Sequence, residues 1–305
     1  MHPTSSNAVT AGDQMTEHFQ IPGEAHIGRV HLQVSNLEKS LQMYGGMLGF
    51  VQMSVGKNTA TLSSSTVAPP LILLTENRDS RPKPPRTTGL YHMAVRFPSR
   101  VALARVLVRL LEHRIPLQGF ADHRVSEAIY LSDHDGNGLE LYADRPRAEW
   151  TWVRGQIEMA TDPLDVDNLL AMAKNDPSAW KGIDQATDIG HIHLQVGDLD
   201  RSERFYHDVI GFDVMQRSYP GALFLAAGGY HHHIGLNIWA GRNAQPPPKE
   251  SVGLLAFTVV VPNQESLSQL GKRLASVGIP HKNGKEGTLI VHDPDGIVVD
   301  FAATN

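Results

Sequence analysis

The chain has 305 residues, no cysteine and a formal net charge of -5, with 16 histidines among its polar residues. This length suggests about two domains. The negative charge gives no electrostatic support to the binding of nucleic acid or of an anionic membrane. The lack of cysteine excludes disulfides, thiolate catalysis and zinc–thiolate sites. Since the sequence has neither a long apolar run nor a charged-then-apolar leader, we expect a cytoplasmic protein without a membrane span or secretory signal.

The first half of the chain contains two similar successions of predicted elements. Residues 1–22 lack periodicity and predict a flexible arm. Residues 27–50 read IGRVHLQVSNLEKSLQMYGGMLGF, in which VHLQV alternates like a strand with one buried face and Asn36 is a good N-cap for a following helix. A second strand, YHMAVRF, precedes Ser99, which caps a helix with Leu and Val at helical spacing. Short strands separated by Gly and Asp turns follow each helix, which predicts two βαβββ modules.

The second half repeats the first. Residues 189–212 read IGHIHLQVGDLDRSERFYHDVIGF and match residues 27–50 at a constant offset of 162 positions (189 − 27). The later segments 89–99 and 133–143 match 253–263 and 293–303, and Asp198 and Asn263 are the corresponding N-caps. The sequence therefore predicts an α+β fold with tandem duplicated domains at 23–145 and 186–305, made of four βαβββ modules.

The connector at 146–185 has a different character. It contains Trp150, Trp152 and Trp180, and a short helix is predicted around Leu164–Lys174. The tryptophans predict that this segment packs on the domains.

The strand–helix signatures and the later segment DHDGNGLELYADRP resemble the vicinal oxygen chelate superfamily. This superfamily includes glyoxalase I, bleomycin and fosfomycin resistance proteins, and extradiol ring-cleaving dioxygenases. The layout and the segment YHHHIGLNIWAG at 230–241 are most similar to two-domain catechol 2,3-dioxygenase-like proteins. The resemblance implies cupped mixed sheets formed by paired modules around a metal. The ligands would come from the first strand of one module and from the first and last strands of its partner.

The superfamily pattern and the repeat together indicate six equivalent positions for metal ligands. In the first half these are Arg29, His92 and Glu140, and in the second half His191, Ala256 and Asp300. Neither half has a complete set, because a guanidinium cannot bind a cation and alanine offers no ligand.

Pairing the modules across the two halves gives a complete site from His191, His92 and Glu140. The other three positions, Arg29, Ala256 and Asp300, then cannot form a metal site. The resemblance thus implies one divalent metal. Two imidazoles and one carboxylate favour Fe(II), with Mn, Ni, Co or Zn as alternatives.

Further histidines lie near this predicted site. His193 is two residues from His191 and shares its strand face. We expect it to be catalytic, or to have a structural role in common with its repeat mate His31.

A strand across residues 231–237 would place His231, His233, Gly235 and Asn237 on one face. We expect His233 to be catalytic, as a proton shuttle or a hydrogen-bond donor to a bound phenolate, and His231, Asn237 and Tyr230 to contact substrate. The alternative is a surface cluster resembling a metal-binding tag. Phe224 and Trp239 are candidates for the pocket wall or for the core.

The resemblance implies an extradiol-type dioxygenase that acts on a catechol-like or hydroquinone-like aromatic diol with O₂. Two alternatives are a glyoxalase-like lyase or isomerase, against which the missing fourth ligand at Gly235 argues, and a non-catalytic protein that binds an aromatic compound or antibiotic. No nucleic-acid or membrane partner is expected. A monomer and a homodimer are both compatible with a site that needs no second chain.

Overall fold

The computed structural model describes residues 19–174, 180–284 and 287–304. Most of the predicted N-terminal arm lies outside the described residues. Its last part, residues 19–22, packs on the protein: Ile21 is buried, and its backbone N–H donates to the carbonyl of Gly211 at 3.1 Å.

Four modules follow the predicted order of one strand, one helix and three strands. The first contains β1 (His26–Val34), α1 (Leu37–Leu41), a π-helical turn (Gln42–Met47), β2 (Val51–Val55), β3 (Thr59–Ser63) and β4 (Ile72–Glu76). The second contains β5 (Gly89–Phe97), α2 (Arg100–Glu112), β6 (Gly119–Asp122), β7 (Ser126–Ser132) and β8 (Gly138–Asp144).

The second half has the same plan. The third module contains β11 (Asp188–Gln195), α4 (Leu199–Glu203), a π-helical turn (Arg204–Val209), β12 (Asp213–Gln216), β13 (Ala222–Ala226) and β14 (Ile234–Asn237). The fourth contains β15 (Gly253–Val261), α5 (Gln264–Ser276), β16 (His281–Asn283), β17 (Leu289–His292) and β18 (Val298–Ala303). The connector carries a 3₁₀ turn (Arg147–Glu149), β9 (Trp152–Val153), β10 (Gln156–Ile157) and α3 (Val166–Lys174).

The predicted caps begin the helices. The side chains of Asn36, Ser99, Asp198 and Asn263 each accept a hydrogen bond from a backbone N–H three residues later. Such a bond satisfies one of the free N–H groups at a helix start.

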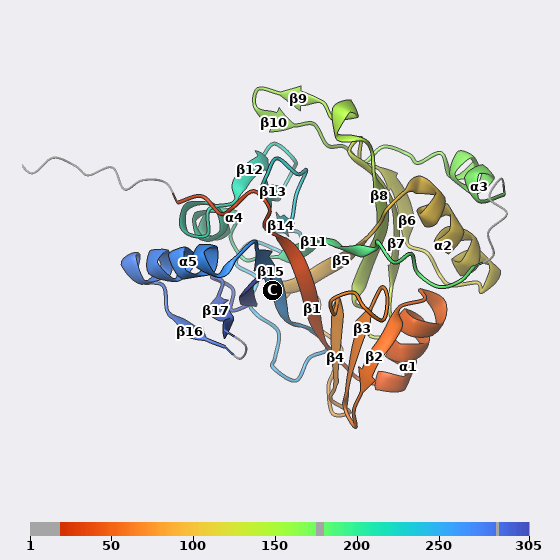
Figure 1. The fold of residues 1–305 in the computed structure, drawn as a ribbon, viewed down its shortest axis with the longest axis horizontal. Helices are drawn as coiled ribbons and strands as arrows, with labels where there is room; N and C mark the ends of the chain where they lie inside the picture. The colour runs from red at the N-terminus through yellow and green to blue at the C-terminus, as the bar shows by residue number, and fades with distance from the viewer. Residues whose placement is uncertain (1–18, 175–179, 285–286, 305) are drawn as a thin grey trace, which may run out of the picture.

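The modules pair across the two halves of the chain. One eight-stranded sheet has the order β12-β13-β14-β11-β5-β8-β7-β6, and the other has the order β16-β17-β18-β15-β1-β4-β3-β2. Module three therefore joins module two, and module four joins module one (Figure 1). The crossed pairing predicted from the ligand positions is confirmed. Each half of the sequence is divided between both sheets.

The hairpin between β7 and β8 and its repeat anchor the sheets to neighbouring helical turns. Asp133 accepts hydrogen bonds from the backbone of Asp135 and Asn137, as expected for a tight turn, and from the Tyr44 hydroxyl at 2.9 Å. In the other hairpin, Asp293 accepts from the Tyr206 hydroxyl at 3.0 Å. These buried polar pairs join modules that neighbour one another in sequence but lie in different sheets.

Burial raises the pKa of Asp293 to about 6, against about 3.9 in an unfolded chain. The folded state binds the proton more tightly, so this carboxyl lowers stability as the pH rises from about 4 to about 6. Asp293 also accepts hydrogen bonds from the backbone N–H groups of Asp295 and Ile297. We expect Asp293→Asn, whose amide oxygen can still accept these two bonds and whose amide nitrogen can donate to the Tyr206 hydroxyl, to remove the pH dependence. Urea unfolding would measure the free energy of unfolding of Asp293→Asn minus that of wild type. This difference should rise by on the order of 2 kcal/mol between pH 4 and pH 7. A difference that does not change with pH would contradict the assignment.

The connector packs on the domains, as its tryptophans predict. Trp150 is buried in a small core cluster with Val125 and Tyr230, and α3 lies against α2 with Leu169 buried (Figure 1). Trp152 is half-exposed, and the ring of Trp180 lies under the guanidinium of Arg109.

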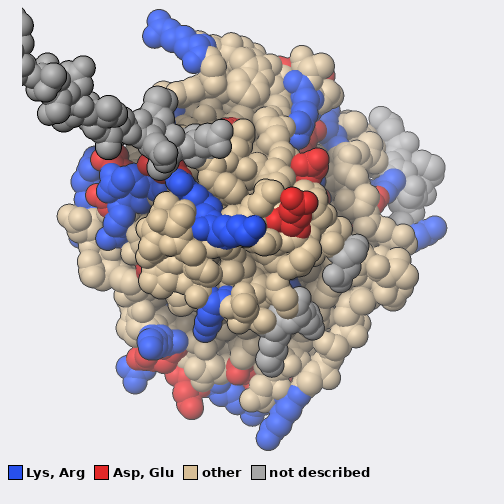
Figure 2. Space-filling model, turned by 60° about the vertical axis from the view of Figure 1, so that its left-hand side comes forward, with Lys and Arg blue, Asp and Glu red and all other residues tan. Residues whose placement is uncertain are grey.

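The surface carries charges of both signs. On the face in Figure 2, Lys and Arg gather at the left with Asp and Glu among them, and both kinds of charge are scattered over the rest of a largely uncharged surface. Among the described residues, no helix is long and apolar enough to cross a membrane.

Candidate metal centre

The three predicted ligands come together in the sheet formed by modules two and three. His191 on β11 and Glu140 on β8 both lie opposite Ala94 of the central strand β5, from its two sides. His92 is two residues from Ala94 and so points to the same face of β5. The methyl group of Ala94 takes up little of the space over which the three longer side chains converge.

Their ligand atoms lie within 4.8 Å of one another, and all three residues are buried. Glu140 Oε2 is 3.0 Å from His92 Nε2 and 3.3 Å from His191 Nε2. His92 Nε2 has no partner with hydrogen-bond geometry among the described residues. Converging imidazole nitrogens and a carboxylate oxygen around one point fit a divalent metal ion.

The charge states also suit a cation. Burial lowers the pKa of His191 to about 4 against the opposing effect of Glu140, so this imidazole is neutral near neutral pH. Burial raises the pKa of Glu140, but His191 and His92 outweigh this effect and hold it well below its usual range. Neutral imidazoles with an ionised carboxylate are the forms that bind metal.

The other sheet holds no equivalent cluster among the described residues, as predicted. Ala256 lies opposite His31 there, just as His92 lies opposite His193. Asp300 Oδ1 is buried without a hydrogen-bond partner, and burial raises the pKa of this carboxyl. Thr258 takes the place of Ala94 opposite Asp300, so the central position is also more crowded.

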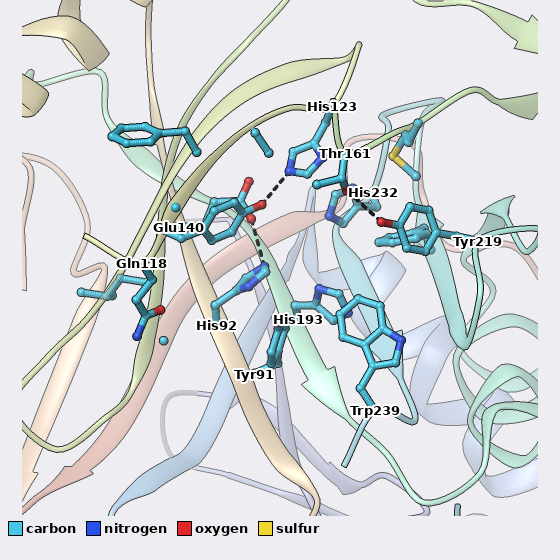
Figure 3. A pocket seen from close by; sticks show the side chains of 18 of the residues that line it. Tyr91, His92, Gln118, His123, Glu140, Thr161, His193, Tyr219, His232 and Trp239 are labelled. Carbon is cyan, nitrogen blue, oxygen red and sulfur yellow. Dashed lines mark hydrogen bonds and ion pairs between the residues drawn. The ribbon is translucent and has the colours of Figure 1, made fainter. Parts of the chain in front are cut away.

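A cavity of about 410 Å³ opens beside the cluster, and His92 and Glu140 form part of its wall (Figure 3). Half of the other lining residues are aromatic or histidine. Tyr91 and Trp239, which meet edge to face at 5.3 Å between ring centroids, are partly exposed at its border. No lysine or arginine is among the described residues that line it.

The connector covers this cavity. Its residues 156–162 run from one edge strand of the sheet to the other. Near β12 the Gln216 side chain donates to the carbonyl of Met159 at 3.4 Å, and at β6 Asp122 and Asp162 exchange two backbone hydrogen bonds of 2.9 Å. Between these points Thr161 lies 2.8 Å from the Tyr219 hydroxyl. The connector thus turns an open cup into a pocket.

Two residues at this cover were not identified from the sequence. His123 Nδ1 lies 2.6 Å from the carbonyl of Ala160 and therefore carries the proton of that hydrogen bond. Its Nε2 is then an acceptor for the hydroxyl of Tyr130, also at 2.6 Å. Tyr130 lies opposite Glu140 across β7 and β8, and burial, together with the charge of Glu140, raises its pKa well above the ordinary value.

The repeat contained a signal for Tyr130. In the other sheet Ile290 lies opposite Asp300 as Tyr130 lies opposite Glu140. A polar residue that occurs at this position only in the sheet with the metal ligands marks a position near the site.

His193 lines the cavity, as its shared face with His191 predicts. Burial lowers its pKa well below the ordinary value. The Asn237 amide group donates to His193 Nε2 at 3.0 Å, while its oxygen accepts from the backbone of Trp239. Asn237 therefore lies behind His193 and is not among the described residues of the cavity wall.

The strand prediction was wrong for residues 231–233. β14 begins only at Ile234, so alternation does not apply before it. The described cavity wall includes His232, and neither His231 nor His233. His233 Nδ1 accepts from the backbone N–H of Ala227, and burial lowers its pKa to about 3.

All three histidines are less than 9% exposed, which contradicts a surface cluster. Tyr230, expected to contact substrate, is buried behind the wall with its hydroxyl 2.7 Å from that of Tyr142 and 3.1 Å from Asp144. Phe224 and Trp239 do line the cavity.

Gly235 has a packing role. It lies opposite His193, and a Cβ atom there would meet His193 Cγ at 2.9 Å. Leu73 occupies the equivalent position opposite His31 in the other sheet. The glycine therefore makes room for the imidazole of His193.

We expect Gly235→Ala to displace the His193 ring from Asn237 and to lower stability by about 1–3 kcal/mol, as overpacking does. Denaturant unfolding and a crystal structure of the variant would measure both effects. Gly46→Ala is the control, since a Cβ atom there meets nothing within 4 Å. An unmoved His193 ring would show that the close approach is unimportant.

Comparisons with known proteins agree with this architecture. The model of the glyoxalase/bleomycin resistance protein/dioxygenase superfamily matches residues 26–141 and 188–301. A catechol-2,3-dioxygenase of Bacillus subtilis (strain 168) is 45% identical over 283 residues, which cover 91% of this chain and 97% of that protein.

Solved structures share the fold. A putative dioxygenase from Bacillus subtilis subsp. subtilis str. 168 has a TM-score of 0.64 at 14% identity and covers 93% of this chain and 86% of its own. Glyoxalase I from Zea mays has a TM-score of 0.54 at 15% identity, with coverage of 91% and 92%. Since the family model matches both halves and the similarity to the Bacillus enzyme spans nearly the whole chain, this protein belongs to the glyoxalase/bleomycin resistance protein/dioxygenase superfamily.

Proposed function

We propose that the protein is an Fe(II)-dependent extradiol dioxygenase that cleaves an uncharged catechol beside its two hydroxyl groups. The observation that carries this proposal is the convergence of His92, His191 and Glu140 at the wall of an aromatic pocket. His92, His191 and Glu140 would hold a divalent ion, which would act as a Lewis acid towards the hydroxyls of a diol, and iron would also supply the redox chemistry that dioxygen requires. The similarity to a catechol-2,3-dioxygenase supports the reaction class.

The cavity wall favours a planar, uncharged ring. Tyr91, Trp239 and Phe224 offer aromatic faces and edges for packing against it. A carboxylate on the ring would lose water without meeting a cation, since no lysine or arginine is among the described lining residues. Catechol and alkylcatechols are therefore preferred over ring-carboxylated diols.

The residues under the connector are placed to accept a proton. Because the Tyr130 hydroxyl donates to His123 Nε2, its oxygen is free to accept from a hydroxyl of the bound diol. A proton that leaves the diol would pass to Tyr130, whose own proton moves to His123 Nε2. The carbonyl of Ala160, already bonded to Nδ1–H, would stabilise the resulting imidazolium. The connector covers this path, since its residues Ala160 and Thr161 line the cavity beside His123.

The test is oxygen uptake with catechol, 4-methylcatechol and protocatechuate after anaerobic loading with iron. Extradiol cleavage breaks the bond between a hydroxylated carbon and its unsubstituted neighbour and places both atoms of O₂ in one product, 2-hydroxymuconic semialdehyde from catechol. Mass spectrometry after reaction in ¹⁸O₂ would detect both atoms.

Several results would contradict the proposal. Lack of uptake by an iron-loaded sample excludes the dioxygenase, and isomerisation of a hemithioacetal without oxygen would indicate a glyoxalase-like enzyme. Metal-independent binding of an aromatic compound would indicate a binding protein. Faster turnover of protocatechuate than of catechol would refute only the preference for uncharged rings.

A further inference from the structure

A chain of hydrogen bonds leads from the cavity wall to a partly exposed carboxylate. His232 lines the cavity, and its Nδ1 lies 2.8 Å from Nδ1 of His231. On the other side of that ring, His231 Nε2 lies 2.8 Å from Asp144 Oδ1. His231 is fully buried, whereas the Asp144 side chain is 24% exposed. The two imidazoles therefore link the pocket to Asp144 through one ordered path.

The carboxylate fixes the direction of the first hydrogen bond. Asp144 accepts from the Tyr230 hydroxyl at 3.1 Å and forms an ion pair with Arg96 at 3.4 Å. An ionised carboxylate only accepts, so the proton of the next bond belongs to His231 Nε2.

The direction of the second bond follows from the charge of His231. Arg96 already supplies the positive charge beside Asp144, and a second cation on a fully buried ring would cost free energy. In the neutral ring, Nδ1 of His231 carries a lone pair and accepts from Nδ1–H of His232. The Nε2 atom of His232 is then without a proton.

We propose that His231, held by Asp144, is a positioning residue that keeps His232 in its Nδ1–H tautomer, so that His232 Nε2 accepts a hydrogen bond from a hydroxyl of the bound diol. The part that concerns the diol rests on the proposed function. The tautomer itself follows from these hydrogen bonds and from the neutral state argued for His231, and does not depend on the proposed function. Such a fixed acceptor orients the diol without needing to reorganise when the substrate binds.

Comparison with the other sheet shows that the fold does not require the histidines at this position. Ile234 pairs with Ile192 as Ile72 pairs with Val30 in the other sheet. The three residues before Ile72 are Pro69, Pro70 and Leu71, which stand where the histidines stand before Ile234. The same fold therefore forms without a histidine chain in the sheet that lacks the metal ligands.

The first measurement is ¹⁵N NMR of the full-length, iron-free chain labelled at histidine nitrogens, near neutral pH. We expect His232 to show a protonated Nδ1 and an unprotonated Nε2. His231→Gln is the conservative variant, because its amide can donate to Asp144 and accept from His232 with the same spacing. It should retain this tautomer. His231→Phe removes the acceptor, and His232 should then no longer be held in the Nδ1–H tautomer.

The second measurement is kcat/KM for catechol with the iron-loaded variants. His231→Phe should be about tenfold below His231→Gln, the loss expected for one misdirected hydrogen bond. A purely structural role predicts a change in stability without this rescue.

A protonated Nε2 on His232 in the wild type overturns the proposal, as do equal kcat/KM values for the two variants. If the wild type shows the expected tautomer but does not cleave catechol, the proposed function fails and the diol-binding role with it, while the tautomer stands. The two failures are thus distinguishable.

Discussion

His191→Ala should abolish binding of one divalent ion per chain and all oxygen-dependent turnover. The side chain supplies one of three converging ligand atoms, and the two that remain come from neighbouring strands of a single module. Removing a residue that hydrogen-bonds a metal ligand lowers metal affinity about 10–100-fold, so removing the ligand itself should lower metal affinity by more than about 100-fold. Elemental analysis after anaerobic loading and equilibrium dialysis with Fe(II) would measure the change.

Asp300→Ala is the matched control. Asp300 occupies the position of Glu140 in the sheet whose other two positions are Arg29 and Ala256, and that sheet contains no metal-ligand group among the described residues. The metal content of this variant should equal that of wild type. Retention of iron by His191→Ala, or its loss in Asp300→Ala, would refute the crossed site.

The duplication explains why the metal cluster was predictable from the sequence. A single histidine on a strand is usually a packed residue, but the superfamily pattern assigns His92 and His191 to ligand positions of two repeats that each lack one ligand. Only crossed pairing of the modules completes a set, so the ligand positions also predicted the sheet order that the structure shows. The helix starts could also be predicted from the sequence, because Asn36, Ser99 and their repeat mates cap helices through hydrogen bonds to backbone N–H groups only three residues away.

The cover of the pocket was not predictable in the same way. Residues 156–162 have neither periodicity nor a repeat mate, and their position depends on the two edge strands that they join. The role of His123 arises from a backbone carbonyl in this segment, 37 residues away in sequence. No local pattern specifies such a contact.

The histidine run shows a different limit. Alternation assigns faces only inside a strand, and two consecutive glycines with positive φ, Gly228 and Gly229, turn the chain just before the run. His232 rather than His231 and His233 consequently reaches the cavity. Predicting a strand in this region was insufficient, because the residue at which β14 begins determines which imidazole faces the cavity.

Tyr130→Phe should lower kcat by about 100-fold while leaving the iron content unchanged. The substitution keeps the ring beside Glu140 but removes the hydroxyl that bonds to His123 Nε2, and a positioned proton-transfer group contributes about 10²–10⁴-fold. Since the ring still packs in the wall, KM for catechol should change much less than kcat. Steady-state oxygen uptake and elemental analysis would separate the two effects.

Tyr142→Phe provides the comparison for this variant. Tyr142 is also buried on this sheet and its hydroxyl is also hydrogen-bonded, to Tyr230, but it is not among the described residues that line the cavity. Loss of that bond should lower stability by about 1–3 kcal/mol, with a much smaller effect on kcat than the loss of the Tyr130 hydroxyl. If Tyr130→Phe loses iron or unfolds as readily as it loses activity, the hydroxyl supports the cluster structurally. If kcat falls alone, the proton path from the diol through Tyr130 to His123 accounts for the loss, and the connector that fixes His123 is part of the active site.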